Sequence, residues 1–131
     1  MGRILIVDDD EALATLMDKA LRAEGYEVRR AGDGPAGLKL LEEQPADLVL
    51  LDVRLPGMSG LEVLRQIREQ HPRTLVLVIT GYSSLPVALE AVEGGAVGYL
   101  TKPFKMADLR DRVNKTLGRS GGGGGIVVKV R

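Results

Sequence analysis

Three short apolar runs stand out along the chain, each bounded by polar or turn-forming residues. They cover residues 3–7, 48–51 and 75–80. Unbroken apolar runs of this length are typical of strands that are buried on both faces of a parallel sheet. Weaker runs at residues 26–31 and 96–100 predict two further strands.

Segments with a helical spacing of apolar residues lie between these runs. Within residues 13–21 the apolar positions recur at intervals of three and four, which indicates an amphipathic helix, and Gly25 is placed to end it. A second helix is predicted over residues 35–44, with Pro35 in its first turn. The apolar spacing within residues 106–117 predicts the last helix.

Serine residues mark the starts of the two remaining helices. Ser59 is placed to cap one of them, and Ser83 or Ser84 to cap the other. Strand and helix therefore alternate five times, which predicts an α/β fold: a doubly wound, five-stranded parallel sheet with five helices covering both faces. In open sheets of this kind, ligands bind beyond the carboxyl ends of the strands.

The character of the chain changes after residue 118. Five consecutive glycines occupy residues 121–125, and a β-prone stretch follows. We expect one domain over residues 1–118, a glycine-rich linker over 119–125 and a short β-prone tail over 126–131. The tail is compatible with a disordered end, with the start of a longer linker, or with an added strand at an exposed sheet edge.

Composition removes several classes of site and partner. The chain has no cysteine and one histidine, which excludes disulfides, thiolate catalysis and a histidine-rich metal site. Aromatic residues make up 3% of the chain, and the net charge is zero, so we expect no direct binding of nucleic acid. No segment is apolar for the roughly 18 residues of a membrane span, and the apolar run at residues 4–7 is too short for a signal peptide. We therefore expect a cytoplasmic protein without a membrane segment.

Polar residues suited to chemistry fall at the ends of the predicted strands. Asp8 and Asp9 follow the first strand and Asp52 ends the third. Thr80 ends the fourth strand and Lys102 follows the fifth. Because the carboxyl ends of parallel strands share one edge of the sheet, these side chains are predicted to converge there.

The residue types in this group indicate phosphoryl chemistry. Several carboxylates in one cleft repel one another, and hard oxygen ligands of this kind suit Mg²⁺. A carboxylate can also act as a nucleophile and form an aspartyl-phosphate. Lys102 would neutralise charge on a transferred phosphoryl group, and the Thr80 hydroxyl could donate to one of its oxygens. An acidic run that opens a helix is often only a cap, however, so the prediction depends on all these residues lying at consecutive strand ends.

Four sequence segments resemble bacterial two-component response-regulator receiver domains, which are CheY-like. They are ILIVDDD (4–10), DLVLLDVRLPGMSGLEVL (47–64), LVIT (77–80) and GAVGYLTKPF (95–104). The resemblance extends over residues 1–118. It implies the flavodoxin-like receiver fold with strand order 2-1-3-4-5, and a cis peptide bond before Pro103.

The resemblance also implies how a metal would be held. Asp52 matches the phosphoacceptor of the family. Asp8 and Asp9 match the acid pair that binds Mg²⁺, with Asp9 favoured as the direct ligand, and the backbone carbonyl of Arg54 matches a further ligand. Asp10 falls at a position that the family fills with varied residues, so it is left out of the predicted site.

The remaining matches concern the switch and the lifetime of the phosphoryl group. Thr80 and Lys102 match the switch hydroxyl and the phosphate-binding lysine, and Tyr99 matches the aromatic residue that turns inward when Thr80 moves. The implied change is at the face formed by the fourth helix, the fifth strand and the fifth helix. The bulky Arg54 and Tyr82 lie at the mouth of the predicted cleft, and we expect them to slow self-dephosphorylation.

The implied function is that of a phosphoacceptor signalling domain, which assists its own phosphorylation and dephosphorylation but is not an enzyme for another substrate. Its expected partners are a sensor histidine kinase or phosphotransfer protein, and a downstream target or an output domain. A homodimer formed on phosphorylation is a further expectation. The alternatives are an interaction module that is never phosphorylated and an Asp-nucleophile phosphohydrolase, although such hydrolases usually carry the nucleophile on the first strand.

Overall fold

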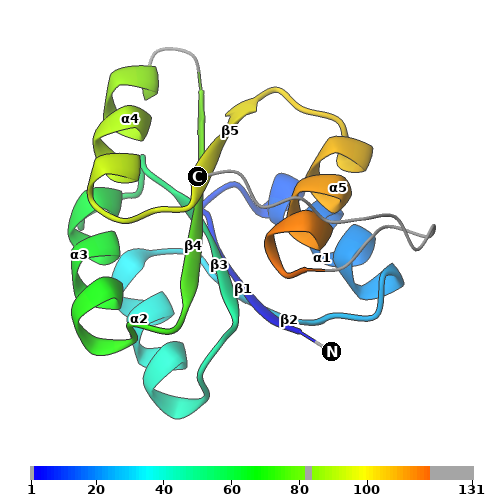
Figure 1. Cartoon of the computed structure of the whole chain (residues 1–131), viewed down its shortest axis with the longest axis horizontal. Coiled ribbons are helices and arrows are strands. Elements are labelled where there is room, and N and C mark those ends of the chain that lie inside the picture. Colours follow the sequence, from blue (N-terminus) through cyan, green and yellow to red (C-terminus); the bar gives the residue numbers. More distant parts are fainter. Residues whose placement is uncertain (1, 82–83, 119–131) are drawn as a thin grey trace.

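The computed structural model describes residues 2–81 and 84–118 of the 131-residue chain. Strands and helices alternate along these residues, as the sequence predicts (Figure 1). In chain order the elements are β1 (Arg3–Val7), α1 (Glu11–Ala23), β2 (Glu27–Ala31), α2 (Gly34–Glu43), β3 (Leu48–Asp52), α3 (Gly60–Gln70), β4 (Leu75–Gly81), α4 (Leu85–Glu93), β5 (Gly98–Lys102) and α5 (Met106–Thr116).

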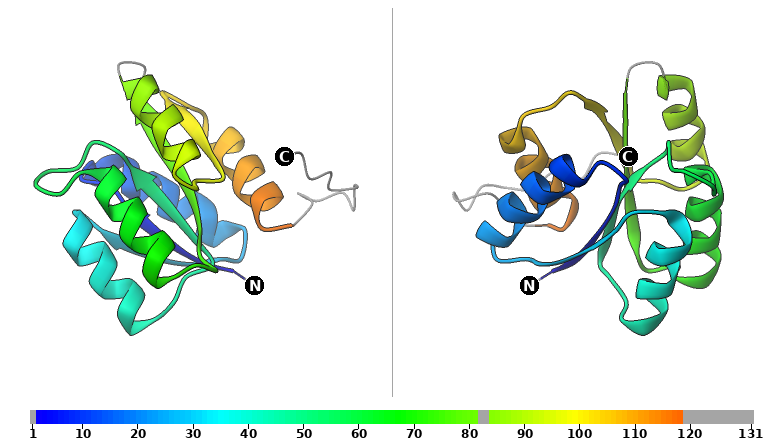
Figure 2. Two further views of the ribbon diagram at one scale, coloured as in Figure 1. Left: turned by 60° about the vertical axis from the view of Figure 1, so that its left-hand side comes forward. Right: turned by 180° about the vertical axis from the view of Figure 1, so that it is seen from behind.

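The five strands form one parallel sheet in the order β2-β1-β3-β4-β5, which confirms the predicted topology. Helices α1 and α5 cover one face of the sheet, and α2, α3 and α4 cover the other (Figures 1 and 2). The strand order reverses between β1 and β3. In doubly wound sheets, this switch point opens a crevice at the carboxyl ends of the two strands.

Two apolar cores lie on the two faces of the sheet, and the side chains of each strand alternate between them. In β1, Ile4 and Ile6 pack under α1 and α5, while Leu5 and Val7 pack under the opposite helices. The middle strands are buried on both faces, which explains why their sequences are unbroken apolar runs. This alternation also fixes the face on which each polar residue at a strand end is presented.

Local signals explain where several helices begin and end. The Ser59 side chain accepts a hydrogen bond from the Leu61 N–H at 3.1 Å, so it caps α3 as predicted. Gly25 follows the end of α1 with φ of 96°, a conformation that glycine adopts without strain. The peptide bond between Lys102 and Pro103 is cis, as the family resemblance implies.

The fifth strand lies two residues later than the sequence analysis places it. The apolar pattern predicts a strand over residues 96–100, whereas β5 is Gly98–Lys102. The reason is that Gly95 turns the chain with φ of 112°, and Ala96 packs into the core while still part of the connection. Ladder pairing with β4 begins only where Gly98 lies opposite Leu77. Lys102 therefore ends β5 instead of following it.

The start of α4 also differs from the prediction. Ser84 occupies the N-cap position of α4, but its side chain accepts no hydrogen bond from the helix. Its hydroxyl is engaged instead by the Arg54 side chain. The other candidate cap, Ser83, lies outside the described residues, as do Tyr82, the predicted linker and the predicted tail. Across residues 2–81 and 84–118, no helix has the length and apolar character needed to cross a membrane.

Candidate functional site

Three carboxylates meet at the carboxyl edge of the sheet. Oxygen atoms of Asp8, Asp9 and Asp52 all lie within 4.8 Å of one another. Asp8 and Asp52 are buried, with 4% and 6% of their surface exposed, whereas Asp9 is exposed. The structure thus brings together the three acids that the strand ends were predicted to gather.

The backbone holds one oxygen of each buried carboxylate. The Asp10 N–H donates to Asp8 Oδ1 at 2.9 Å, and the Arg54 N–H donates to Asp52 Oδ1 at 2.8 Å. In both cases the donor lies two residues after the acid, which is the geometry of an Asx turn. The Asp10 side chain itself caps α1 by accepting from the Leu13 N–H.

Lys102 connects the second oxygens of the same two carboxylates. Its Nζ lies 3.1 Å from Asp52 Oδ2 and 3.4 Å from Asp8 Oδ2. Asp8, Asp52 and Lys102 all lie on the α1/α5 side of their strands, because each follows the alternation of the core residues before it. Residues far apart in the chain are therefore held in one ion-pair group.

Burial and the neighbouring charges have opposing effects on the pKa values of Asp8 and Lys102. Burial raises the pKa of Asp8 above 3.8, the Asp10 N–H and the Lys102 charge act to lower it, and the Asp52 charge raises it further. For Lys102, burial acts to lower the pKa, but the Asp52 and Asp8 carboxylates together raise it above 10.5. One lysine charge thus faces two buried carboxylates, near which the exposed Asp9 adds a third acid.

These residues fit a hard divalent cation. Asp8 Oδ2 is buried and, although it is ion-paired with Lys102, it accepts no hydrogen bond from the part of the chain that the structure describes. A buried carboxylate oxygen in this condition has unused capacity to bind a cation. The acids offer oxygen donors only, which is the ligand chemistry of Mg²⁺ rather than of Zn²⁺.

Gly60 holds the loop after β3 against the site, and the sequence analysis assigns it no function. A Cβ atom on Gly60 would lie 2.5 Å from Val53 Cα and 2.8 Å from the Asp52 carbonyl oxygen. The Gly60 N–H also donates to the Val53 carbonyl at 3.2 Å. The first residue of α3 can therefore contact the backbone of Asp52 only because it has no side chain. The glycine at the end of the PGMSG loop was the available sequence signal.

Thr80 and Tyr99 lie on the opposite face of the sheet from Lys102. Thr80 is 1% exposed and donates its hydroxyl to the Gly81 carbonyl at 3.3 Å. Tyr99 pairs in register with Val78, and its side chain packs against the core under α2, α3 and α4. The two residues are thus on neighbouring strands and on the same face, but the Thr80 hydroxyl is directed to its own strand.

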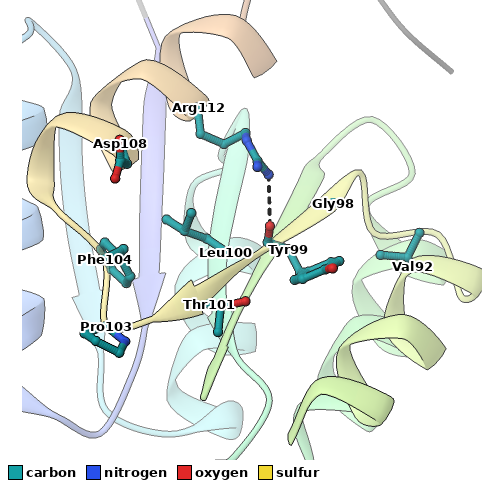
Figure 3. A pocket seen from close by; sticks show the side chains of 9 residues that line it. All are labelled: Val92, Gly98, Tyr99, Leu100, Thr101, Pro103, Phe104, Asp108 and Arg112. Carbon is teal, nitrogen blue, oxygen red and sulfur yellow. Dashed lines mark hydrogen bonds between the residues drawn. The ribbon is translucent and has the colours of Figure 1, made fainter. Parts of the chain in front are cut away.

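A groove of about 610 Å³ runs along the outer edge of β5 (Figure 3). In Figure 3 the Tyr99 side chain points toward α4, where Val92 lies at the rim. From the other side, Arg112 of α5 donates to the Tyr99 carbonyl at 2.9 Å. This hollow is separate from the carboxylates. A second hollow of about 400 Å³ adjoins Lys102 and is lined also by Asp10, Leu13, Pro103 and Phe104.

Comparison with curated proteins places the chain among response regulators. It is 42% identical over 120 residues to the uncharacterized transcriptional regulatory protein YkoG of Bacillus subtilis, covering 92% of this chain and 53% of YkoG. It is 36% identical to sporulation initiation phosphotransferase F of the same species, covering 88% of this chain and 93% of that protein. The chain spans about half the length of YkoG and of TcrX of Mycobacterium tuberculosis.

Solved structures give the same answer. The receiver domain of NtrX from Brucella abortus is 34% identical, with a TM-score of 0.84 over 89% of this chain and 99% of that one. A CheY-like receiver domain protein from Methanospirillum hungatei is 36% identical, with a TM-score of 0.85 over 90% and 94%. The family model for the response regulator receiver domain matches residues 4–114. The chain therefore belongs to the response regulator receiver domain family.

Proposed function

We propose that this receiver domain accepts a phosphoryl group on Asp52 from a phosphohistidine of a sensor histidine kinase or phosphotransfer protein. The observation that carries the proposal is the state of the Asp52 carboxylate. One oxygen is fixed by the Arg54 N–H, and the other lies 3.1 Å from the Lys102 ammonium, beside two more acids. This arrangement orients a carboxylate and surrounds it with charges that suit a phosphoryl group.

The transfer exchanges one bond to phosphorus for another. A carboxylate oxygen of Asp52 attacks the phosphorus, and an O–P bond forms while the P–N bond to the donor imidazole breaks. The electron pair of the broken bond stays on that imidazole nitrogen, and the other ring nitrogen of the donor already carries a proton, so the ring leaves as a neutral imidazole. The product is an acyl phosphate on Asp52 and a neutral histidine on the donor, so charge and atoms are conserved.

Other residues of the chain stabilise the charge of the transferred group. Lys102 is within reach of Asp52 and supplies a fixed positive charge. Asp8, Asp9, Asp52 and the Arg54 backbone carbonyl would hold Mg²⁺, which when bound supplies further positive charge for the phosphoryl oxygens. The Thr80 hydroxyl lies one strand away and would turn from the Gly81 carbonyl to donate to a phosphoryl oxygen.

The response follows on the other face of the sheet. Movement of Thr80 leaves space for Tyr99 to turn inward, which changes the groove between α4, β5 and α5. That face would then bind a downstream target, an output domain or a second copy of the chain. Curated relatives such as ZraR of Escherichia coli are named transcriptional regulatory proteins, and this chain covers 26% of ZraR. We propose that residues 1–118 act as the receiver in the cytoplasm, followed by a linker and tail.

The proposal is tested by incubating the protein with Mg²⁺ and a small phosphodonor such as acetyl phosphate. The wild type is expected to gain the mass of one phosphoryl group, and Asp52→Asn is expected to gain none, because the amide is not a nucleophile of this kind. Asp111→Asn, an exposed aspartate on α5, is the matched control and should be labelled as the wild type is. Equal labelling of Asp52→Asn and the wild type would refute the assignment. Sustained turnover of a phosphate ester would instead favour a phosphohydrolase.

A further inference from the structure

The Arg54 side chain reaches from the phosphoacceptor loop to the start of α4. Its Nε donates to Ser84 Oγ at 2.5 Å, while the backbone N–H of the same residue donates to Asp52 Oδ1. Ser84 is 2% exposed, so the guanidinium reaches a buried hydroxyl. Arg54 therefore contacts the Asp52 carboxylate with its backbone and the start of α4 with its side chain.

Ser84 stands at the position of a helix cap without acting as one. Its φ of −108° and ψ of 13° lie outside the extended region that N-cap residues adopt. Pro86, in the first turn of α4, has no N–H to donate. The N–H of Val87, at the third helical position, is therefore the donor that a capping Ser84 would use.

We propose that Arg54 is a positioning residue that exchanges partners on phosphorylation, leaving Ser84 for the phosphoryl group on Asp52 and thereby freeing Ser84 to cap α4. This inference rests on the proposed function. In the exchange, the guanidinium gives up a neutral hydroxyl acceptor for phosphoryl oxygens, and Ser84 Oγ gives up the Arg54 donor for the Val87 N–H. No covalent bond changes beyond the phosphorylation itself.

The energetic preference for the exchange comes from charge and geometry. A phosphoryl group adds nearly two negative charges at a carboxylate to which Arg54 is already bonded through its backbone. The guanidinium fork matches phosphate oxygens with two parallel hydrogen bonds, which are stronger than a bond to a neutral hydroxyl. The residue is also exposed, so its side chain can turn without displacing core residues. The start of α4 would thus register the charge on Asp52.

Hydrogen exchange of the Val87 amide, followed by NMR, tests the inference. The proteins are the wild type, Arg54→Met, Ser84→Ala and the double variant, with Arg73→Met as a control for loss of an exposed arginine at the amino ends of the strands. Each is measured with and without Mg²⁺ and phosphodonor, and intact mass gives the phosphoryl loading. Arg54→Met keeps the backbone groups of Arg54 in place.

Without phosphodonor, Arg54→Met is expected to slow Val87 exchange roughly fivefold, which is the effect of one typical N-cap. Phosphorylation is expected to slow Val87 exchange in the wild type and in Arg73→Met by a similar factor. Ser84→Ala and the double variant should show neither change, because they lack the capping hydroxyl.

Two results would overturn the partner exchange while leaving the proposed function intact. One is unchanged Val87 exchange in Arg54→Met without phosphodonor. The other is a wild type that gains the phosphoryl mass but keeps its Val87 exchange rate. A wild type that gains no phosphoryl mass would overturn the proposed function and the partner exchange together.

Discussion

The two sides of the sheet at its carboxyl edge are held in different ways. On the side of α1 and α5, Lys102 joins Asp8 and Asp52, and backbone N–H groups fix one oxygen of each acid. On the side of α4, the Thr80 hydroxyl makes a long bond within its own strand, and the helix begins without a side-chain cap. The first side is held by ion pairs and backbone hydrogen bonds. On the second side, the Thr80 and Ser84 hydroxyls each take part in one side-chain hydrogen bond, which fits the shape change of the proposed function.

Apolar exposure follows the same division. Leu89 and Val92 of α4, and Val97 before β5, are 51%, 37% and 48% exposed. Val92 lines the groove along β5, and Val97 directly precedes Gly98, which also lines it. On the other side, Leu16 is the single large apolar residue of α1 and α5 that is exposed, at 55%. In the proposed function, phosphoryl chemistry therefore belongs to the α1/α5 side of the carboxyl edge, and the output surface belongs to the groove between α4, β5 and α5.

The largest expected effect comes from removing the lysine on the chemical side. Lys102→Met leaves Asp8 and Asp52 without their shared cation, so negative charge on an incoming phosphoryl group is no longer offset. We expect the rate of labelling by a small phosphodonor to fall about 100-fold, the usual cost of losing one electrostatic donor in a transfer site. Lys115→Met, on the exposed surface of α5, is the control and should retain the wild-type rate.

An unchanged labelling rate in Lys102→Met would contradict the division of labour between the two sides. It would mean that the ion pairs of Lys102 serve only to hold the sheet edge together. Intact mass over a time course separates a slower rate from a lower final extent of labelling.

A pair of glycine variants compares the packing against the Asp52 backbone with the packing at the end of β4. Gly60→Ala places a methyl group against the backbone of Val53 and Asp52, and backbone atoms cannot move aside cheaply. We expect it to lower the free energy of unfolding by about 1–3 kcal/mol and to slow labelling of Asp52. At Gly81 a Cβ would meet no atom within 4 Å, so Gly81→Ala should change stability much less. Urea unfolding of both variants is the measurement. Equal losses of unfolding free energy would contradict the tighter packing at Gly60.

The smallest expected effect concerns the charge of Asp8. Asp8→Asn removes a buried carboxylate that faces Asp52, so the variant should be more stable than the wild type at neutral pH when divalent ions are chelated. Added Mg²⁺ should stabilise the wild type more than the variant, because a ligand stabilises the state that binds it. Thermal unfolding with chelator and with Mg²⁺ measures both effects.

The pH dependence of this difference has a defined sign. Burial first, and then the Asp52 charge, raise the pKa of Asp8 above 3.8 in the folded chain. A carboxyl group with a raised folded pKa weakens folding above its unfolded pKa and has no effect below it. The difference in stability between the wild type and Asp8→Asn should therefore grow as the pH rises from 3.8 through the folded pKa of Asp8. A gap that is constant across this range would show that the charge of Asp8 is not its cause.

Periodicity was sufficient to predict the sheet and much of the candidate site. Because side chains alternate along a strand, apolar runs that end in Asp8 and Asp52 place both acids at one edge and on one face. The start of β5 could not be located in the same way, since Ala96 is apolar whether it packs from a connection or from a strand. Its boundary depends on the turn at Gly95.

Contacts that depend on three-dimensional proximity were not predictable from the sequence. Ser84 has the residue type of a helix cap, but a hydroxyl accepts from whichever donor lies nearest, and that donor is Arg54, 30 residues earlier. The tight approach of Gly60 to Asp52 likewise depends on how α3 packs against the end of β3. In both cases the sequence pattern identified the residue, but the packing of distant elements determined which group it contacts.

The bond from Arg112 to the Tyr99 carbonyl also affects how other molecules can meet the sheet. β5 is an edge strand, and exposed edge carbonyls are open to pairing with strands of foreign chains. With a guanidinium occupying a carbonyl near the start of β5, an incoming strand would have to displace an arginine before it could extend the ladder. The groove therefore favours binding partners that insert side chains over partners that add a strand to the sheet. The same hydrogen bond protects the domain against edge-to-edge aggregation.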